Sequence, residues 1–388
     1  MKIGGGAQRN AVELGSALYE KGYDVTFLTF YDKEPAHDYK GKHVCLNHQE
    51  DKASLSDIFQ LLRGSREIRD HCEEKDIDTV FSFLTRMNVQ SISSKVIYGN
   101  EAKIVVSVRN NPVKRNKKSH QKLMKILYPK ADKVVAQTAG IERMLNDIFS
   151  IRNTAVIPNI ANPDKFKREA KKDILGRHEE VFENHFNYIT VGSLTEQKAQ
   201  WYLIRCFYKL SQNEENTKLI ILGEGPLKEE LERLAKDMGL EDRVIFLGEV
   251  ENVFPYLRKA DCFVFTSLFE GFPNVLVEAL SQDLPIISTD CISGPREILC
   301  PELKVGEEVS YPYLGEYGMM TEPLDEKRCF KTLEEKPLSE EENKLFKLMV
   351  KVKEDEELRD RYSNVSRRVE DFEPGKIVPR WISLIEES

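Results

Sequence analysis

Short apolar runs alternate with helix-length amphipathic segments along most of the chain. Between residues 7 and 18 apolar side chains recur at helical spacing, after a glycine run at 4–6 and before Lys21 and Gly22, which predicts a loop that leads into a helix. Runs rich in β-branched and aromatic residues predict strands. In the first part of the chain these runs lie at residues 24–30, 79–84, 104–108 and 133–137. In the second part they lie at residues 188–191, 219–222, 243–247, 262–266 and 285–288.

Strands that alternate with helices predict parallel sheets covered by helices, and the two series of strands predict two α/β halves. The stretch 158–185 has two prolines, many charges and little apolar periodicity, so we expect it to connect the halves. Residues 333–361 are dense in Glu and Lys and favour an exposed helical face over an interaction tail. Apolar residues at helical spacing after Pro374 and Gly375 predict one more helix.

The composition narrows the class of protein. The chain has 388 residues, of which 40% are hydrophobic and 31% charged, and this length favours two domains. No apolar run approaches the ~18 residues of a membrane-spanning helix, and no secretion signal is seen, so we expect a cytoplasmic protein. The formal net charge of −8 argues against a general nucleic-acid binder. Seven scattered cysteines without a C-x-x-C pair predict free thiols in a reducing compartment.

Two glycine-containing segments directly follow predicted strands, where the ligands of parallel sheets bind. Residues 192–198 (GSLTEQK) end in Lys198 at a helix start, where a lysine and free backbone amides can hold an anion. Residues 223–226 (GEGP) permit a tight turn and close backbone approach. A solvated surface lysine and an ordinary strand-to-helix turn are the alternatives.

Two further segments after predicted strands carry charged side chains. Residues 267–279 contain Glu270 in a loop and Glu278 in the following helix, and two such carboxylates suit the hydroxyl donors of a polyhydroxylated ligand. Residues 293–298 (SGPREI) open a helix with Arg296. The alternative for Glu278 is a surface position on an amphipathic helix.

The order and spacing of these motifs resemble a known family. The chain resembles the retaining glycosyltransferases of the GT-B fold, of the group 1 or family 4 type, which include bacterial enzymes of polysaccharide and lipid-linked oligosaccharide synthesis. The resemblance covers nearly the whole chain. It rests on GGGAQRN at 4–10, SFLTRMN at 82–88, SVRNNP at 107–112, ADKVVAQT at 131–138, VIPN at 156–159, VGSLTEQKAQWYLI at 191–204, LGEGP at 222–226, the pair Glu270 and Glu278, and SGPREIL at 293–299.

The resemblance implies an α/β fold with two Rossmann-like parallel-sheet domains that face each other across a cleft. Residues 1–165 would form the acceptor-side domain and residues 185–375 the domain that binds the nucleotide sugar, with a final helix at 376–388 that packs back on the first domain. In similar proteins a strand precedes the glycine loop, whereas only three residues precede it here. The first sheet is therefore expected to lack a strand, and a misassigned start, a shortened chain or an inactive copy would each explain this.

The resemblance also implies roles for residues. Lys198 would contact the diphosphate of the donor, Glu278 the ribose hydroxyls and Glu270 the transferred sugar, which makes Glu270 and Lys198 the expected catalytic residues. The expected donor-binding residues are Gly192, Ser193, Lys198, Gly223, Gly225, Glu270, Gly271, Phe272, Pro273, Asn274, Glu278 and Arg296. The expected acceptor-side residues are Gly5, Gly6, Arg109 and Asn110.

No metal and no cofactor are expected, because Lys198 and a helix N-terminus can neutralise a leaving diphosphate. The acidic triplet at 76–78 precedes a predicted strand and is interpreted as a surface turn. The chain also departs from the family pattern in two of its motifs. Ser193 stands where an arginine is usual, with Arg296 as a candidate substitute, and Arg109 and Asn110 stand near a usual histidine.

A basic segment at residues 113–130 holds seven Lys or Arg and no acid. Leu123, Met124, Ile126 and Leu127 lie beside its lysines, a pattern that suits an anionic membrane surface. The alternative is a solvated helix that packs its apolar face on the sheet. No aromatic platform interleaves the charges, so nucleic acid is not expected. The expected membrane contacts are Lys114, Arg115, Lys117, Lys118, Lys122 and Lys125, which would place the protein peripherally on the inner face of the plasma membrane.

The predicted function is retaining transfer of a sugar from a nucleotide-diphosphate sugar, with UDP as the expected nucleotide. The expected acceptor is a glycan or a polyprenyl-diphosphate-linked sugar in surface polysaccharide synthesis. The alternatives are a sugar-nucleotide epimerase or hydrolase and a catalytically inactive sugar-nucleotide-binding protein.

Overall fold

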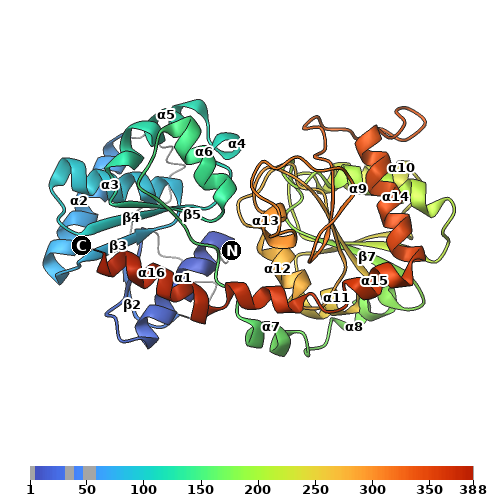
Figure 1. Ribbon diagram of the computed structural model, residues 1–388, viewed down its shortest axis with the longest axis horizontal. Helices are drawn as coiled ribbons and strands as arrows, with labels where there is room; N and C mark the ends of the chain where they lie inside the picture. The colour runs from blue at the N-terminus through green and yellow to red at the C-terminus, as the bar shows by residue number, and fades with distance from the viewer. Residues whose placement is uncertain (1–4, 31–38, 47–57, 388) are drawn as a thin grey trace. The chain divides into compact units, whose positions relative to one another are not determined.

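The computed structural model describes residues 5–30, 39–46 and 58–387, and the chain divides into two compact units. The first unit contains residues 1–160 and 372–388, and the second contains residues 161–371 (Figure 1). Both units are built on parallel strands covered by helices, which confirms the predicted α/β class with Rossmann-like domains. Residues 161–184, most of which lie between the two predicted domains, group with the second unit.

A four-stranded parallel sheet in the order β3-β4-β5-β6 forms the centre of the first unit. A hydrophobic core cluster lies on each face of this sheet. Val106 of β4 belongs to one cluster and Val105 to the other, because successive side chains of a strand point to opposite faces. The strands are β3 (Thr79–Ser82), β4 (Lys103–Val108), β5 (Lys133–Ala136) and β6 (Thr154–Val156).

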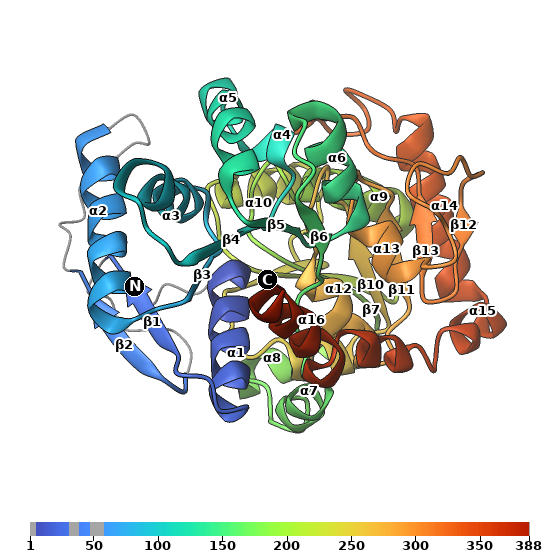
Figure 2. The ribbon, with the colours of Figure 1, turned by 60° about the vertical axis from the view of Figure 1, so that its left-hand side comes forward.

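Two further strands, β1 (Thr26–Thr29) and β2 (Lys42–Cys45), pair with each other in a separate two-stranded parallel sheet (Figure 2). The expectation that a strand is missing before the glycine loop concerns residues 1–4, which lie outside the described residues.

Seven α-helices of the described residues complete the first unit. The last helix of the chain lies beside the first, and both pack in one cluster in which Trp381 is fully buried (Figures 1 and 2). The ring of Trp381 meets that of Phe81 edge-on, with centroids 5.3 Å apart. The helices are α1 (Gly6–Glu20), α2 (Ile58–Lys75), α3 (Thr85–Tyr98), α4 (Pro112–Arg115), α5 (Lys118–Leu127), α6 (Ala139–Phe149) and α16 (Pro374–Glu386).

The second unit contains a seven-stranded sheet in the order β12-β13-β11-β10-β7-β8-β9, in which only β12 runs antiparallel to its neighbour. The strands are β7 (Phe186–Val191), β8 (Thr217–Leu222), β9 (Val244–Gly248), β10 (Cys262–Phe265), β11 (Ile286–Thr289), β12 (Tyr313–Leu314) and β13 (Met319–Thr321). The helices are α7 (Pro163–Glu169), α8 (Gly176–Glu179), α9 (Gln200–Ser211), α10 (Lys228–Asp237), α11 (Phe254–Lys259), α12 (Asn274–Leu280), α13 (Pro295–Leu299), α14 (Glu340–Glu354) and α15 (Glu356–Arg361).

Every predicted strand segment overlaps an observed strand, but the pattern missed β2, β6, β12 and β13. The last three have only two or three residues, too few for an alternating pattern to register. The sequence also missed α7 in the connecting stretch. The side chain of Asn162 accepts a hydrogen bond from the amide of Lys165 and Pro163 opens the helix, a capping signal that the sequence contained.

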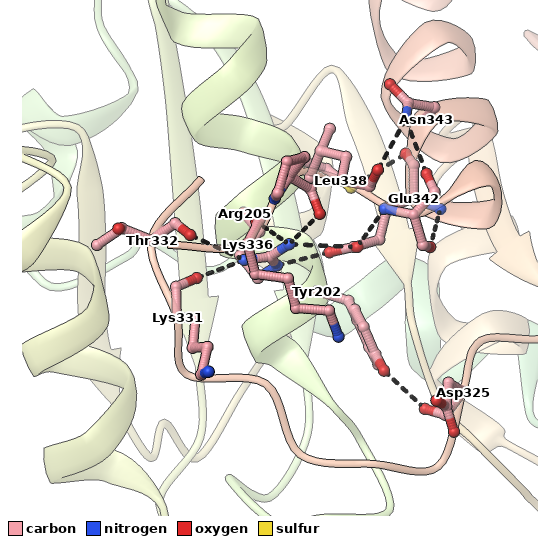
Figure 3. A network of polar contacts seen from close by, with 12 residues as sticks. Tyr202, Arg205, Asp325, Lys331, Thr332, Lys336, Leu338, Glu342 and Asn343 are labelled. Atoms are coloured by element: carbon pink, nitrogen blue, oxygen red, sulfur yellow. Dashed lines mark hydrogen bonds and ion pairs between the residues drawn. The ribbon is translucent and has the colours of Figure 1, made fainter. Parts of the chain in front are cut away.

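A buried ion pair ties α9 to α14 (Figure 3). Arg205 Nε donates to Glu342 Oε1 at 2.6 Å, and both side chains are almost completely buried. The guanidinium also donates to the carbonyls of Lys331, Lys336 and Pro337 in the segment before α14. The same carboxylate accepts the amide of Ser339 in the capping box of α14. Arg205 therefore fixes both α14 and the segment that precedes α14 against α9.

Candidate functional site

The loops after β7 and β8 pack backbone against backbone at the carboxyl end of the second sheet. A Cβ atom on Gly223, whose φ is +135°, would lie 2.1 Å from the carbonyl oxygen of Gly192. One on Gly225 would lie 2.4 Å from the carbonyl oxygen of Leu194. No side chain fits at either position. The close backbone approach predicted for residues 223–226 is therefore an approach to the loop after β7.

Lys198 and Glu270, the two residues predicted to be catalytic, lie in direct contact. Lys198 Nζ is 2.6 Å from Glu270 Oε1, and the two side chains are 17% and 8% exposed. The ammonium also lies 4.8 Å from the centroid of the Phe265 ring, at the end of β10. A carboxylate this buried is costly without a cation, and Lys198 supplies one.

The loop that carries Lys198 is fastened to the loop that carries Glu270. The amide of Leu268 donates to the carbonyl of Gln197 at 2.8 Å, and Gln197 Nε2 donates back to the carbonyl of Phe269 at 3.0 Å. These bonds fix the two loops, which follow adjacent strands, relative to each other on either side of the ion pair. Ser193 is exposed at the start of the first loop.

Glu278 lies in the second turn of α12 and is 7% exposed. Residues 271–273 before the helix are buried, and Asn274 opens it. The following loop closes on this segment, because Ser293 Oγ donates to the carbonyl of Glu270 at 2.8 Å. A Cβ on Gly294, whose φ is +91°, would lie 2.5 Å from the carbonyl oxygen of Gly271. The structure thus brings together the candidate segments at residues 267–279 and 293–298.

Arg296 forms an ion pair with Asp290, a partner that the sequence did not predict. Its Nε lies 3.0 and 3.2 Å from the two carboxylate oxygens of Asp290, and its Nη2 also contacts that carboxylate. Tyr311 donates its hydroxyl to the same carboxylate at 2.6 Å, and burial together with this bond raises the pKa of Tyr311 to about 12. Arg296 is therefore paired with a carboxylate, as Lys198 is, and an anion that binds Arg296 would have to replace Asp290.

Cys291 is a neighbour of the Lys198–Glu270 pair that the sequence analysis did not single out. Its side chain is 2% exposed, and burial and the nearby Glu270 carboxylate raise the pKa of the thiol well above its ordinary value. Its position two residues after β11, at the edge where parallel sheets generally bind ligands, was the available signal.

The acceptor-side candidates lie in the first unit. Gly5 caps α1, and its amide donates to Gln8 Oε1 at 3.0 Å, while Gly6 is the first residue of the helix. Arg109 and Asn110 follow β4. Arg109 Nη2 donates to Asn159 Oδ1 at 2.6 Å, a partner that comes from the segment after β6.

The basic segment forms α4, α5 and a short 3-10 turn, and its six predicted membrane-contact residues are all exposed. Its apolar face is largely occupied, however, because Met124 is in a core cluster and Leu123 and Leu127 pack against it. Ile126, which is 66% exposed, is left on the surface. The predicted apolar membrane face is therefore reduced to a single residue beside the lysines.

Within the described ranges, no group of three or more His, Cys, Asp or Glu side chains is arranged to hold a metal ion. Asp76 and Asp78 are exposed in the turn between α2 and β3, with Asp76 at a φ of +52°. Nor does any helix of the described residues have the length and apolarity needed to cross a bilayer.

Comparison with known proteins identifies the family. Residues 4–165 match the model of Glycosyltransferase Family 4, and residues 185–311 match that of Glycosyl transferases group 1. An uncharacterised glycosyltransferase of Methanocaldococcus jannaschii is 38% identical over 381 residues, which cover 95% of this chain and 94% of that protein. The chain belongs to the family 4 glycosyltransferases. The resemblance predicted from the motifs is therefore confirmed.

A second relative of this glycosyltransferase has a described reaction. It is the N-acetylgalactosamine-N,N'-diacetylbacillosaminyl-diphospho-undecaprenol 4-alpha-N-acetylgalactosaminyltransferase of Campylobacter jejuni, 30% identical over 315 residues. The match covers 79% of this chain and 75% of that protein. These relatives do not favour the epimerase, hydrolase or inactive alternatives.

Solved structures share the fold. The Anabaena HepE protein, crystallised with UDP and glucose, has a TM-score of 0.75 at 17% identity, over 100% of this chain and 98% of that chain. Sucrose-phosphate synthase of Thermosynechococcus elongatus has a TM-score of 0.76 at 16% identity, over 100% and 94% of the two chains. The GT-B fold of this glycosyltransferase follows from these matches.

Proposed function

We propose that this glycosyltransferase moves a sugar from a UDP-sugar to a polyprenyl-diphosphate-linked or glycan acceptor in surface polysaccharide synthesis, with retention of anomeric configuration. The observation that carries the donor part is the Lys198–Glu270 pair, held 2.6 Å apart by fastened loops at the carboxyl ends of β7 and β10. A nucleotide diphosphate needs cations and a sugar needs carboxylate acceptors, and this pair offers one of each.

The ion pair holds both side chains in position before the donor arrives. When the diphosphate binds, Lys198 donates to a phosphate oxygen, and Glu270 is released to accept hydrogen bonds from hydroxyls of the transferred sugar. Glu278, buried on α12, is assigned to the ribose hydroxyls. No residue acts as a nucleophile in this proposal: the departing phosphate oxygen takes the proton of the acceptor hydroxyl on the face from which it leaves.

The acceptor assignment is supported by the named substrate of the Campylobacter relative, which carries an undecaprenyl diphosphate. A lipid-linked acceptor requires the enzyme to work at a membrane surface. The exposed lysines of α5 suit an anionic leaflet, with Ile126 as one apolar contact. Donor chemistry is assigned to the second unit and membrane contact to the first.

The test is an assay of the purified full chain with a panel of UDP- and GDP-sugars and a polyprenyl-diphosphate-linked sugar. Transfer from a UDP-sugar, with a product anomer that matches the donor anomer by NMR, supports the proposal. Donor hydrolysis or epimerisation without transfer would replace it with the first alternative. Binding without turnover would replace it with the inactive sugar-nucleotide-binding protein.

A further inference from the structure

Arg109 in the first unit is a guanidinium with neutral partners. It follows the buried strand β4 and donates to Asn159 Oδ1 at 2.6 Å and to Ser107 Oγ at 3.3 Å. Its guanidinium lies 5.3 Å from the centroid of the Phe83 ring. No carboxylate of the described residues pairs with it, and burial without such a partner lowers the pKa of Arg109.

The atoms around Arg109 are also incompletely bonded. Arg109 Nε is buried and has no hydrogen-bond partner. Gln137, which follows β5 and is 3% exposed, donates Nε2 to Asn159 Oδ1, whereas its Oε1 has no partner. One buried donor and one buried acceptor are thus left open in a single cluster, and each such group costs free energy when unsatisfied.

Asn10 adds a third incomplete side chain. It is 2% exposed on α1, and neither its Nδ2 nor its Oδ1 has a partner in the part of the chain that the structure describes. Leu14, one turn later on the same helix face, packs with residues of β4 and β5. Asn10 is not part of the site proposed below, which rests on Arg109, Gln137 and Asn159.

These open groups have a definite chemical preference. A guanidinium without a carboxylate attracts an anion, and Arg binds phosphate oxygens especially well. The free Oε1 of Gln137 accepts a hydrogen bond, which phosphodiester and diphosphate oxygens do not donate but a hydroxyl does. A phosphate with a hydroxyl close to it satisfies both.

We propose that Arg109, Gln137 and Asn159 form a site for a hydroxyl-bearing phosphate ester at the carboxyl ends of β4, β5 and β6. Arg109 Nε donates to a phosphate oxygen, Gln137 accepts from a sugar hydroxyl, and Asn159 fixes the orientation of both side chains. The phosphate comes from a lipid-linked sugar diphosphate or from a free sugar phosphate. The assignment of this ligand as the acceptor rests on the proposed function.

The first test measures binding without turnover. Isothermal titration of the full chain with α-D-glucose 1-phosphate, at saturating UDP, is expected to show binding that Arg109→Gln weakens at least tenfold. The matched control is Arg152→Gln, which removes an exposed charge before β6, at the opposite end of the sheet. Methyl α-D-glucoside is expected not to bind. Equal affinity of wild type and Arg109→Gln would overturn the proposal.

Two further measurements separate a binding role from other roles. If Arg109 were structural, Arg109→Gln would lower the melting temperature. Removal of a half-buried charge that no carboxylate balances is expected to leave the melting temperature unchanged or raise it. If Arg109 served the donor, the variant would lose UDP affinity as strongly as glucose 1-phosphate affinity. Either a lowered melting temperature or that parallel loss would overturn the proposal.

Gln137→Leu tests the hydroxyl contact. It is expected to weaken glucose 1-phosphate at least threefold and to leave the affinity for inorganic phosphate unchanged, and equal weakening of both would contradict the assignment. Competition identifies the source of the phosphate. A short-chain polyprenyl-diphosphate sugar displaces glucose 1-phosphate if the lipid-linked acceptor uses the site, and fails to do so if the site takes free sugar phosphates. All these measurements can succeed even if sugar transfer is never observed.

Discussion

Lys198 and Glu270 are separated by 72 positions in the chain and meet at 2.6 Å in the structure. The contact means that each side chain already has a charged partner, so in the proposed function the diphosphate replaces Glu270 as the partner of Lys198. Removal of Lys198 leaves the buried Glu270 carboxylate without its cation and is therefore expected to lower stability as well, whereas Glu270→Gln leaves only the more exposed lysine unpaired.

The first prediction concerns the two carboxylates. Glu270→Gln and Glu278→Gln should each lower the turnover of sugar transfer at least tenfold, a loss of ~1.4 kcal/mol in the activation barrier, with little change in melting temperature. The neutral amide keeps the shape but is a weaker acceptor for sugar and ribose hydroxyls. Glu232→Gln on the exposed face of α10 is the control. Wild-type turnover in both variants would remove these residues from the site.

The second prediction concerns the cation. Lys198→Ala should weaken UDP affinity at least tenfold in a titration, because the diphosphate loses its lysine partner. Lys236→Ala, at an exposed position of α10, should leave the affinity unchanged. Unaltered UDP affinity in Lys198→Ala would show that the lysine serves only to balance Glu270.

A third prediction follows from assigning phosphate neutralisation to the protein. If Lys198 and the backbone amides at the start of α9 carry the charge of the leaving diphosphate, excess EDTA should leave the transfer rate within twofold. The measurement compares initial rates with and without EDTA in metal-free buffer. Complete loss of activity that manganese restores would contradict this account.

At the residue scale, the sequence predicted where the candidate side chains lie but not what they touch. Lys198, Glu270 and Arg296 each follow a strand of a parallel sheet, and this order along the chain was enough to place them at one edge. Their partners depend on loops that are distant in sequence. Neither the Arg296–Asp290 pair nor the Arg109–Asn159 bond has a spacing that a periodic pattern could reveal.

At the scale of elements, the second unit depends on a buried charge as well as on apolar packing. Arg205 on α9 reaches Glu342 on α14 and three carbonyls of the preceding segment (Figure 3). Tyr202, one turn earlier on α9, donates its hydroxyl to the carbonyls of Asp325 and Lys327. The helix that begins beside Lys198 is thus fastened to a long segment without regular structure.

The fourth prediction tests that fastening. Arg205→Met should lower the free energy of unfolding by ~3 kcal/mol, because it leaves the Glu342 carboxylate buried without a cation. Urea denaturation of the full chain measures the change. Glu342→Leu in the same chain should restore much of the loss, since two apolar side chains then replace the pair. No difference between Arg205→Met and wild type would mean that the pair adds nothing to stability.

Most strands of the two larger sheets were predictable because buried parallel strands are continuous β-branched and aromatic runs, as in CFVF of β10. The pattern failed where an element is short or defined by its caps. β12 has two residues, and α7 is marked by Asn162 and Pro163 rather than by an apolar stripe. The roles of α5 could not be separated by sequence, because the same apolar residues suit a membrane or a core.

At the scale of the whole molecule, the proposal assigns donor binding to the second unit and acceptor and membrane contact to the first. The chain leaves the first unit at residue 160 and returns to it at residue 372, and α16 completes the core of the first unit around Trp381. Two crossings of the chain join units that have separate sheets and separate clusters of candidate residues. A change in the first unit that spares its core should therefore leave nucleotide binding in the second unit intact.

The fifth prediction uses this separation. Each lysine near an anionic leaflet contributes ~1 kcal/mol at low salt, and the attraction is screened within a Debye length of ~10 Å at 0.1 M salt. Changing Lys117, Lys118, Lys122 and Lys125 together to Gln should abolish sedimentation with phosphatidylglycerol liposomes and leave UDP affinity unchanged. Because Ile126 is the one apolar residue left exposed beside these lysines, charge has to supply most of the binding, so raised salt should also release the wild type.

The matched control removes the same charge from the second unit, with Gln at the exposed positions Lys236, Lys327, Lys347 and Lys351. It should sediment like the wild type if the surface of α5 is the contact, and lose sedimentation as well if net charge alone matters. Equal sedimentation of the α5 variant and the wild type would mean that the basic segment is a solvated helix whose apolar side chains serve the core. Met124, Leu123 and Leu127 already pack in the core of the first unit. Binding of the wild type to liposomes therefore depends on the exposed lysines, and the α5 variant tests their contribution directly.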